Sequence, residues 1–159
     1  MPGSRLKVDP SEQMIRLGED FFLEGVQKLV GYGLLEPQMA YNRRQRFTKK
    51  RVAVVEFATG CELILRGILR KNGCAIYNRN INEVIRSCYD QYPSLTNEHN
   101  SIEELRKLRN EIVHGAIERG DKKRSYFIGA ISCLTKLYGT EKITRKAFIQ
   151  RINEVARSF

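Results

Sequence analysis

Apolar residues recur at three- and four-residue intervals along most of the chain, which is the pattern of amphipathic helices. No alternating run with a hairpin turn signal indicates a strand. Asp9-Pro10-Ser11-Glu12 offers an N-cap, a proline at the first helical position and a glutamate at the third. The glycines of Gly31-Tyr32-Gly33 and Asn72-Gly73 are typical of helix ends. We expect helices over residues 10–30, 38–71, 81–89, 100 or 101 to 118, 123–138 and 143–157, with a polar loop over 90–100.

The second of these helices changes character along its length. Its first part is basic and polar, whereas apolar residues occupy nearly every side of residues 52–69. A helix that is apolar all round is buried among several neighbours. We therefore expect an all-α fold, an up-and-down bundle of five to six helices around this central helix. The chain, 1–159, is expected to form one domain, with residues 1–9 as a flexible N-terminal segment.

The composition fits a domain with a core of its own, since 42% of the 159 residues are hydrophobic. The most apolar stretch, 52–69, is interrupted by Glu56, Glu62 and Arg66, so it does not predict a membrane span. Residues 1–9 lack the apolar centre of a signal peptide. We expect a cytoplasmic protein that does not interact with a membrane.

The cysteines are far apart in the sequence and include no Cys-x-x-Cys pair. They are Cys61, Cys74, Cys88 and Cys133. This spacing favours reduced thiols over a disulfide framework and does not fit the common zinc-site patterns. The two histidines, His99 and His114, are too few for a His-rich metal site. We therefore expect neither a bound metal nor another cofactor.

Basic residues outnumber acidic ones by 28 to 18, which gives a formal net charge of +10. The largest basic group lies within residues 43–51 and contains no acid. Its members are Arg43, Arg44, Arg46, Lys49, Lys50 and Arg51. Recurring basic groups of this kind favour binding to nucleic acid or phosphate; the alternative is a solvated helix face. The sequence shows no RRM, KH, zinc-finger or leucine-zipper pattern, whereas a helix-turn-helix stays open.

Residues 104–115 hold the strongest candidate for chemistry. On a helical wheel, at about 100° per residue, Arg109 falls within the apolar face, and Asn110 and His114 share a stripe at its edge. A buried arginine is unfavourable unless it is paired, and Glu62 is expected to point inward from the most buried helix. We therefore predict an ion pair between Arg109 and Glu62. The alternative is a guanidinium that reaches the edge of the core and contacts nothing in particular.

These residue types suit metal-free cleavage of an RNA phosphodiester. An imidazole titrates near neutral pH, so His114 can transfer protons at the 2′-hydroxyl or the departing 5′-oxygen. A guanidinium holds two phosphate oxygens at once, so Arg109 can offset the extra negative charge of the transition state. Acid and base roles together need a second histidine, which a symmetric homodimer would supply. The alternative is a structural or solvated His114.

The string Leu-Arg-Asn-Glu-Ile-Val-His-Gly at 108–115 resembles the HEPN (higher eukaryotes and prokaryotes nucleotide-binding) superfamily. The signature of that superfamily is an arginine, four further residues and a histidine, often with asparagine directly after the arginine. Arg109, Asn110 and His114 match it. The string Ala-Thr-Gly-Cys-Glu-Leu-Ile-Leu at 58–65 is similar to an earlier HEPN helix that carries an inward acidic residue. The resemblance covers residues 10–157.

The resemblance implies an HEPN-like bundle and, as in many members, a metal-independent endoribonuclease of a toxin–antitoxin or antiviral defence system. Two copies would face each other in one composite cleft. His114 would be the general acid–base, and Arg109 would bind the scissile phosphate. Asn110 would position the site, and Glu62 would orient Arg109. Cleavage would leave a 2′,3′-cyclic phosphate and a 5′-hydroxyl. The basic residues expected to contact the RNA are Arg106, Lys107, Arg43, Arg44, Arg46, Lys49 and Lys50.

One departure from the family concerns regulation. Toxins paired with a nucleotidyltransferase antitoxin often carry a tyrosine two residues after the histidine, where this chain has Ala116. AMP transfer to that tyrosine is therefore not supported, whereas an antitoxin or nucleotidyltransferase partner of another kind stays open. Two other functions also stay open. One is a non-catalytic HEPN module that binds RNA, nucleotide or a partner enzyme. The other is a basic helical nucleic-acid-binding protein in which Arg109 and His114 are incidental.

Overall fold

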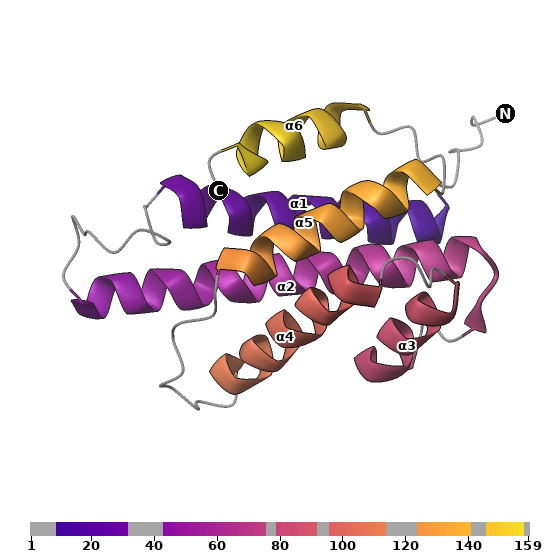
Figure 1. Cartoon of the computed structure of the whole chain (residues 1–159), viewed down its shortest axis with the longest axis horizontal. Coiled ribbons are helices and arrows are strands. Elements are labelled where there is room, and N and C mark those ends of the chain that lie inside the picture. Colours follow the sequence, from indigo (N-terminus) through magenta and orange to yellow (C-terminus); the bar gives the residue numbers. More distant parts are fainter. Residues whose placement is uncertain are drawn as a thin grey trace, which may run out of the picture.

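A computed structural model describes residues 9–31, 43–75, 79–91, 96–113, 124–140 and 146–157 of the chain. Within these ranges the regular secondary structure is helical, and no strand occurs. The helices are α1 (Pro10–Gly31), α2 (Arg43–Lys71), α3 (Ile81–Gln91), α4 (Thr96–Val113), α5 (Arg124–Thr140) and α6 (Lys146–Ala156). The long helices follow one another in alternating directions along the long axis (Figure 1). The predicted all-α bundle is confirmed.

The start of α4 differs from the expectation. The helix begins at Thr96, so the expected polar loop up to Asn100 is too long. Thr96 and Glu98 are favoured in the first turn of a helix, and Pro93 was the last strong helix-breaking signal before them. His99 therefore belongs to α4. Other expected boundaries fall on residues 1–8, 32–42, 114–123 and 141–145, which lie outside the described residues.

Two helix ends are set by the capping residues that the sequence indicated. The carboxylate of Asp9 accepts a hydrogen bond from the backbone N–H of Ser11 at 2.9 Å, which satisfies a donor of the first turn of α1. At the end of α2, Gly73 has a φ of 75°. Its N–H donates to the carbonyl of Arg70 at 3.0 Å. This left-handed conformation favours glycine, so the chain leaves α2 at the predicted position.

Helices α1 and α2 run antiparallel with their backbones in close contact along a seam of glycines. A Cβ atom at Gly25 would lie 2.6 Å from the backbone nitrogen of Phe57, and one at Gly60 would collide with the backbone nitrogen of Phe22. Gly18 lies against the same part of α2. Only residues without a Cβ permit this separation, which holds α2 in a fixed register on α1.

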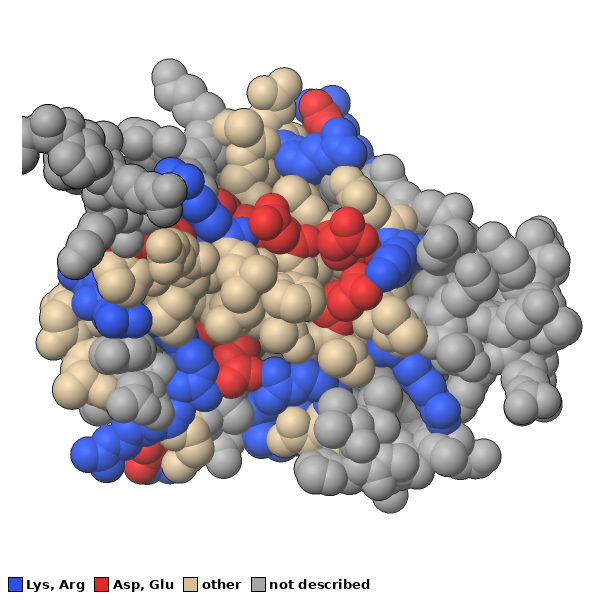
Figure 2. Space-filling model, turned by 180° about the vertical axis from the view of Figure 1, so that it is seen from behind, with Lys and Arg blue, Asp and Glu red and all other residues tan. Residues whose placement is uncertain are grey.

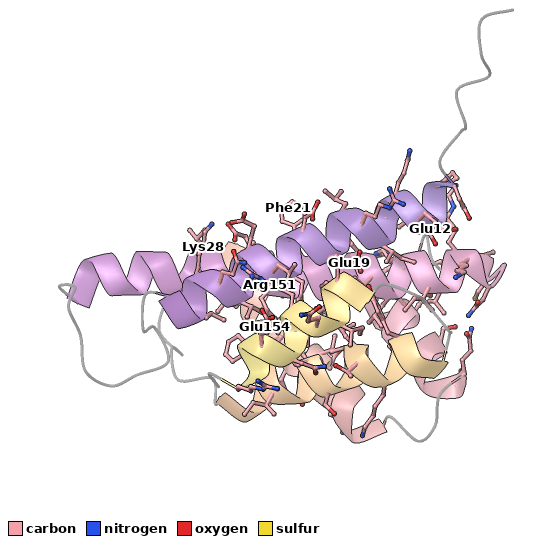
Figure 3. All side chains as sticks on the ribbon, turned by 90° about the horizontal axis from the view of Figure 1, so that it is seen from above. Glu12, Glu19, Phe21, Lys28, Arg151 and Glu154 are labelled. Carbon is pink, nitrogen blue, oxygen red and sulfur yellow. The ribbon has the colours of Figure 1, made fainter. Side chains whose placement is uncertain are left out.

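Aromatic side chains join α1 and α2 to α5. The ring centroids of Phe22 and Phe57 are 4.7 Å apart, and those of Phe57 and Phe127 are 5.2 Å apart. The buried hydroxyl of Tyr138 on α5 donates to a carboxylate oxygen of Glu19 on α1 at 2.9 Å. Figure 3 shows Glu19 on the side of α1 that faces α6, whereas Phe21 lies on the opposite side. The polar pair therefore fixes the orientation of α5 over α1.

Helix α2 is central, as its all-round apolar pattern predicted. It contacts α1 along its length, and it also contacts α3 and α4. Its buried residues Phe57, Ile64 and Leu65 have no more than 1% of their surface exposed. No helix in the described part of the chain is long and apolar enough to cross a membrane. The side of α2 that meets α3 and α4 carries the candidate site.

Candidate functional site

Arg109 on α4 and Glu62 on α2 form an ion pair. Nη1 of Arg109 donates to Oε2 of Glu62. The side chains are only 17% and 18% exposed, so the pair is largely shielded from water. The contact predicted from the two helical wheels is therefore confirmed, and the alternative of a guanidinium without a specific partner is wrong. A charge in such a place is stable only when its partner is also present.

The other oxygen of Glu62 binds a second arginine. Oε1 accepts hydrogen bonds from Nε of Arg66 at 3.0 Å and from Nη2 of Arg66 at 2.8 Å. Sequence reasoning noted Arg66 only as a charge that interrupts the apolar stretch 52–69 and did not link it to Glu62. The spacing of four residues on one helix was the signal available, because residues i and i+4 are neighbours on a helix surface.

The two arginines keep Glu62 ionised. Burial by itself would raise the pKa of the carboxyl, because it disfavours the charged form. Hydrogen bonds and positive charge from Arg109 and Arg66 act in the opposite direction and outweigh burial, so the pKa of Glu62 lies below its ordinary value. At neutral pH the cluster therefore holds two positive charges and one negative charge.

The remaining candidates on α4 lie beside this cluster. Oδ1 of Asn110 accepts a hydrogen bond from Nη2 of Arg109 at 3.4 Å, so both atoms of the guanidinium fork have a neighbour. Arg106 pairs with Glu103 on the same helix at 2.7 Å, and Lys107 pairs with Glu104 at 3.4 Å. Arg106 is 15% exposed and Lys107 is 50% exposed. Of these two cations, Lys107 is the one whose side chain extends into solvent.

Several candidates fall on parts of the chain that the structure does not describe. His114 and Ala116 belong to residues 114–123, which lie outside the described residues. Residues 43–50 form the first two turns of α2, but the side chains of the basic group there are outside the described part. The proximity of His114 to Arg109 therefore rests on their spacing in the sequence.

The described surface carries charges of both signs. On the face opposite to that of Figure 1, acidic side chains lie next to basic ones around an area of uncharged residues (Figure 2). Among the described residues, the large apolar side chains that are most exposed are Leu17, Val52, Ile128 and Phe21. No group of three or more His, Cys, Asp or Glu side chains in the described ranges is placed to hold a metal ion. The chemistry that these residues offer is that of guanidinium groups near a carboxylate and an amide.

Such an arrangement can bind a phosphodiester. Arg109 is held in place by Glu62, and a fixed guanidinium loses less conformational entropy when it binds an anion. Because Glu62 is shared with Arg66, its single negative charge does not neutralise both arginines. A phosphate at Arg109 would therefore meet a site with excess positive charge.

Comparison of the chain with protein-family models, curated proteins and solved structures found no match. The resemblance to the HEPN superfamily therefore stays a prediction. The signature residues and the helical fold are the observations behind it.

Proposed function

We propose that the chain is a metal-independent endoribonuclease of the HEPN type, acting as a toxin or as an effector of antiviral defence. The observation that carries the proposal is the largely buried Arg109, which Glu62 on another helix holds in place. His114 follows it after four residues. An arginine in a shielded position with a histidine close by supplies phosphate binding and proton transfer at one place.

In the proposed reaction, the 2′-oxygen of a ribose attacks the neighbouring phosphorus, and the bond from phosphorus to the 5′-oxygen breaks. The imidazole of His114 takes the proton from the 2′-hydroxyl. A second imidazole donates a proton to the departing 5′-oxygen. Arg109 binds the non-bridging phosphate oxygens, on which negative charge increases in the transition state. The products are a 2′,3′-cyclic phosphate and a 5′-hydroxyl, and no metal takes part.

The proposal includes a homodimer with a composite active site. One copy brings a single histidine in this segment, whereas the reaction needs an acid and a base. A two-fold symmetric dimer, the commonest form of homo-oligomer, supplies the second His114. The basic residues at 43–50, together with Arg106 and Lys107, would bind the RNA backbone. An antitoxin or a nucleotidyltransferase of another kind would be the protein partner, and the place of action would be the cytoplasm.

RNA cleavage in EDTA tests the proposal. The wild-type protein is incubated with a mixed-sequence RNA and compared with His114→Ala and Arg109→Ala, after circular dichroism has shown that both variants are folded. We expect cleavage by the wild type and a loss of about 10²–10⁴ in rate in His114→Ala. Cleavage that survives in a folded His114→Ala would rule out the mechanism. Binding of RNA by the wild type without cleavage would instead favour the non-catalytic module.

A further inference from the structure

Glu62 is divided between two arginines, one for each of its oxygens. Arg66 occupies Oε1 with two of its nitrogens, at 2.8 and 3.0 Å, and Arg109 occupies Oε2. A carboxylate with both oxygens engaged by charge-assisted hydrogen bonds has little freedom to rotate. The position of Arg109 therefore depends on the hydrogen bonds that Arg66 donates to the same carboxylate.

Arg66 is itself anchored at the corner between α2 and α3. Its Nη1 donates to the backbone carbonyl of Arg79. The next residue, Asn80, accepts the N–H of Glu83 with its side chain at 3.0 Å and so caps the start of α3. The guanidinium of Arg66 thus connects a helix cap to Glu62. It is 17% exposed, which matches the exposure of Arg109.

The charge of the cluster depends on Arg66 as well. One carboxylate paired with one arginine would be neutral and would compete with a phosphate for that arginine. With Arg66 present, two guanidinium groups share one carboxylate, and the cluster keeps one excess positive charge. The attraction between opposite charges is stronger in a shielded place than in water. Arg66 therefore leaves Arg109 with more capacity for an anion than a simple pair with Glu62 would allow.

We propose that Arg66 is a positioning residue of the Arg109 site, which acts through Glu62 to hold the guanidinium of Arg109 and to keep the site attractive to an RNA phosphate. This inference rests on the proposed function for its ligand. The contacts that carry it do not include His114. We assign Arg66 to Glu62 rather than to the phosphate, because its Nε, Nη1 and Nη2 all donate to protein oxygens, whereas the described hydrogen bonds of Arg109 use Nη1 and Nη2 and leave its Nε to a ligand.

The first test uses the NMR signals of the Arg109 side chain and needs no RNA. Arg66→Lys keeps the positive charge, but a single ammonium group cannot reproduce the fork that grips Glu62 and the carbonyl of Arg79. We expect the Arg109 side-chain N–H signals to shift and broaden in Arg66→Lys. Arg70→Lys, one turn further along α2, is the control and should leave them unchanged. Unchanged Arg109 signals in a folded Arg66→Lys would overturn the inference.

The second test measures binding of a 2′-O-methyl RNA oligonucleotide, which lacks the attacking hydroxyl, by fluorescence anisotropy. We expect Arg66→Gln to weaken binding about tenfold and Arg66→Lys to weaken it measurably, although its charge is kept. In a Glu62→Gln background, Arg66→Gln should weaken binding only as much as Arg70→Gln does, since the link through Glu62 is already broken. An equal effect of Arg66→Gln in both backgrounds would overturn the inference.

The outcomes separate this inference from the proposed function. Arg109 signals that respond to Arg66→Lys in a protein that neither binds nor cleaves RNA would overturn the nuclease and leave the positioning role intact. If the wild type cleaves RNA but Arg66→Lys leaves the Arg109 signals unchanged, the positioning role is overturned and the nuclease is left intact. If Arg66→Gln does not fold, Arg66→Lys carries both tests, because it retains the charge and most of the side-chain volume.

Discussion

Glu62 on α2 accepts a hydrogen bond from Arg109 on α4, although the two residues are 47 positions apart in the sequence. The contact joins the central helix of the bundle to the helix that carries the candidate motif. Because both side chains are largely shielded, neither charge is stable in this place without a partner. The fold therefore holds Arg109 in one position, which is what a group that binds a transition state requires.

Both the charge and the shape of the Arg109 guanidinium should contribute to the rate of cleavage. We expect Arg109→Ala to lower the single-turnover rate in EDTA by about 10²–10³, because the developing charge on the phosphate loses its partner. Arg109→Lys should fall between this variant and the wild type, since an ammonium group lacks the two-pronged geometry. Arg151→Ala on α6, a half-exposed arginine paired with Glu154, is the control and should cleave normally. Equal rates for Arg109→Ala and the control would contradict the role of Arg109.

The lowered pKa of Glu62 predicts a pH-dependent contribution to stability. A carboxyl whose pKa is lower in the folded than in the unfolded state stabilises the fold above the ordinary value, about 4.3 for Glu. This contribution is lost as the pH falls through the lower pKa of the folded state. The gap in unfolding free energy between the wild type and Glu62→Gln should therefore be constant from pH 6 to 8 and shrink below about pH 4.3. Urea unfolding across this range measures the gap.

An exposed carboxylate provides the comparison. Glu24 is 63% exposed and lies 3.9 Å from Lys28, so Glu24→Gln should change stability little at any pH. A gap for Glu62→Gln that grows as the pH falls would contradict the sign of the pKa shift.

The glycine seam predicts which glycines tolerate a methyl group. Gly60→Ala places a Cβ against the backbone of α1, which cannot move without separating the two helices. We expect a loss of about 1–3 kcal/mol in the free energy of unfolding. At Gly67 the first contact of a Cβ is a side-chain atom, Cγ1 of Ile15 at 2.6 Å, and the backbone atoms of Ser11 and Ile15 lie farther away, at 3.1 and 3.2 Å, so Gly67→Ala should lose less. Thermal and urea unfolding give the order, and the reverse order would show that the helices are not in backbone contact at Gly60.

The basic residues at the start of α2 should govern the salt dependence of RNA binding. Replacing Arg43, Arg44 and Arg46 with Gln removes three cations and should flatten the slope of log affinity against log salt by about 2. The control is a triple variant in which Gln replaces Lys136 on α5, Arg151 on α6 and Arg157, which follows α6. These positions are exposed, so the control removes the same charge from another part of the surface. Equal slopes for the wild type and the first variant would show that this group does not contact RNA.

The buried thiols should resist modification in the folded protein. Burial, together with the nearby Cys133, raises the pKa of the Cys61 thiol, so it stays protonated and unreactive. Cys133 is also fully buried, whereas Cys74 is half-buried. Iodoacetamide at pH 8, followed by mass spectrometry, should label Cys74 before Cys61, and Cys61 only after unfolding. Rapid labelling of Cys61 in the native protein would contradict the packing of α2 against α5.

The sequence predicted the parts of this molecule that depend on helical periodicity and local capping. Asp9 and Gly73 are local signals, so the beginning of α1 and the end of α2 could be placed within a residue. The contact between Glu62 and Arg109 was also predictable, because two opposite charges on apolar faces of buried helices need each other.

Features that depend on tertiary packing were not predictable in the same way. The early start of α4 at Thr96 lies in a polar segment without apolar periodicity. The link from Arg66 to the carbonyl of Arg79 depends on how the corner between α2 and α3 folds back, and no residue pattern reports it. The glycines of α1 and α2 did not show that the two backbones would touch, because a glycine in a sequence can also mark a turn or a helix end.

The chemical groups at the cleaved RNA ends show whether the ribose 2′-oxygen is the attacking group. The wild-type protein is incubated in EDTA with an RNA oligonucleotide and with its 2′-O-methyl counterpart, and the products are identified by mass spectrometry. We expect a 2′,3′-cyclic phosphate and a 5′-hydroxyl from the RNA and no cleavage of the 2′-O-methyl strand. Products with a 3′-hydroxyl and a 5′-phosphate, or cleavage of the 2′-O-methyl strand, would contradict it.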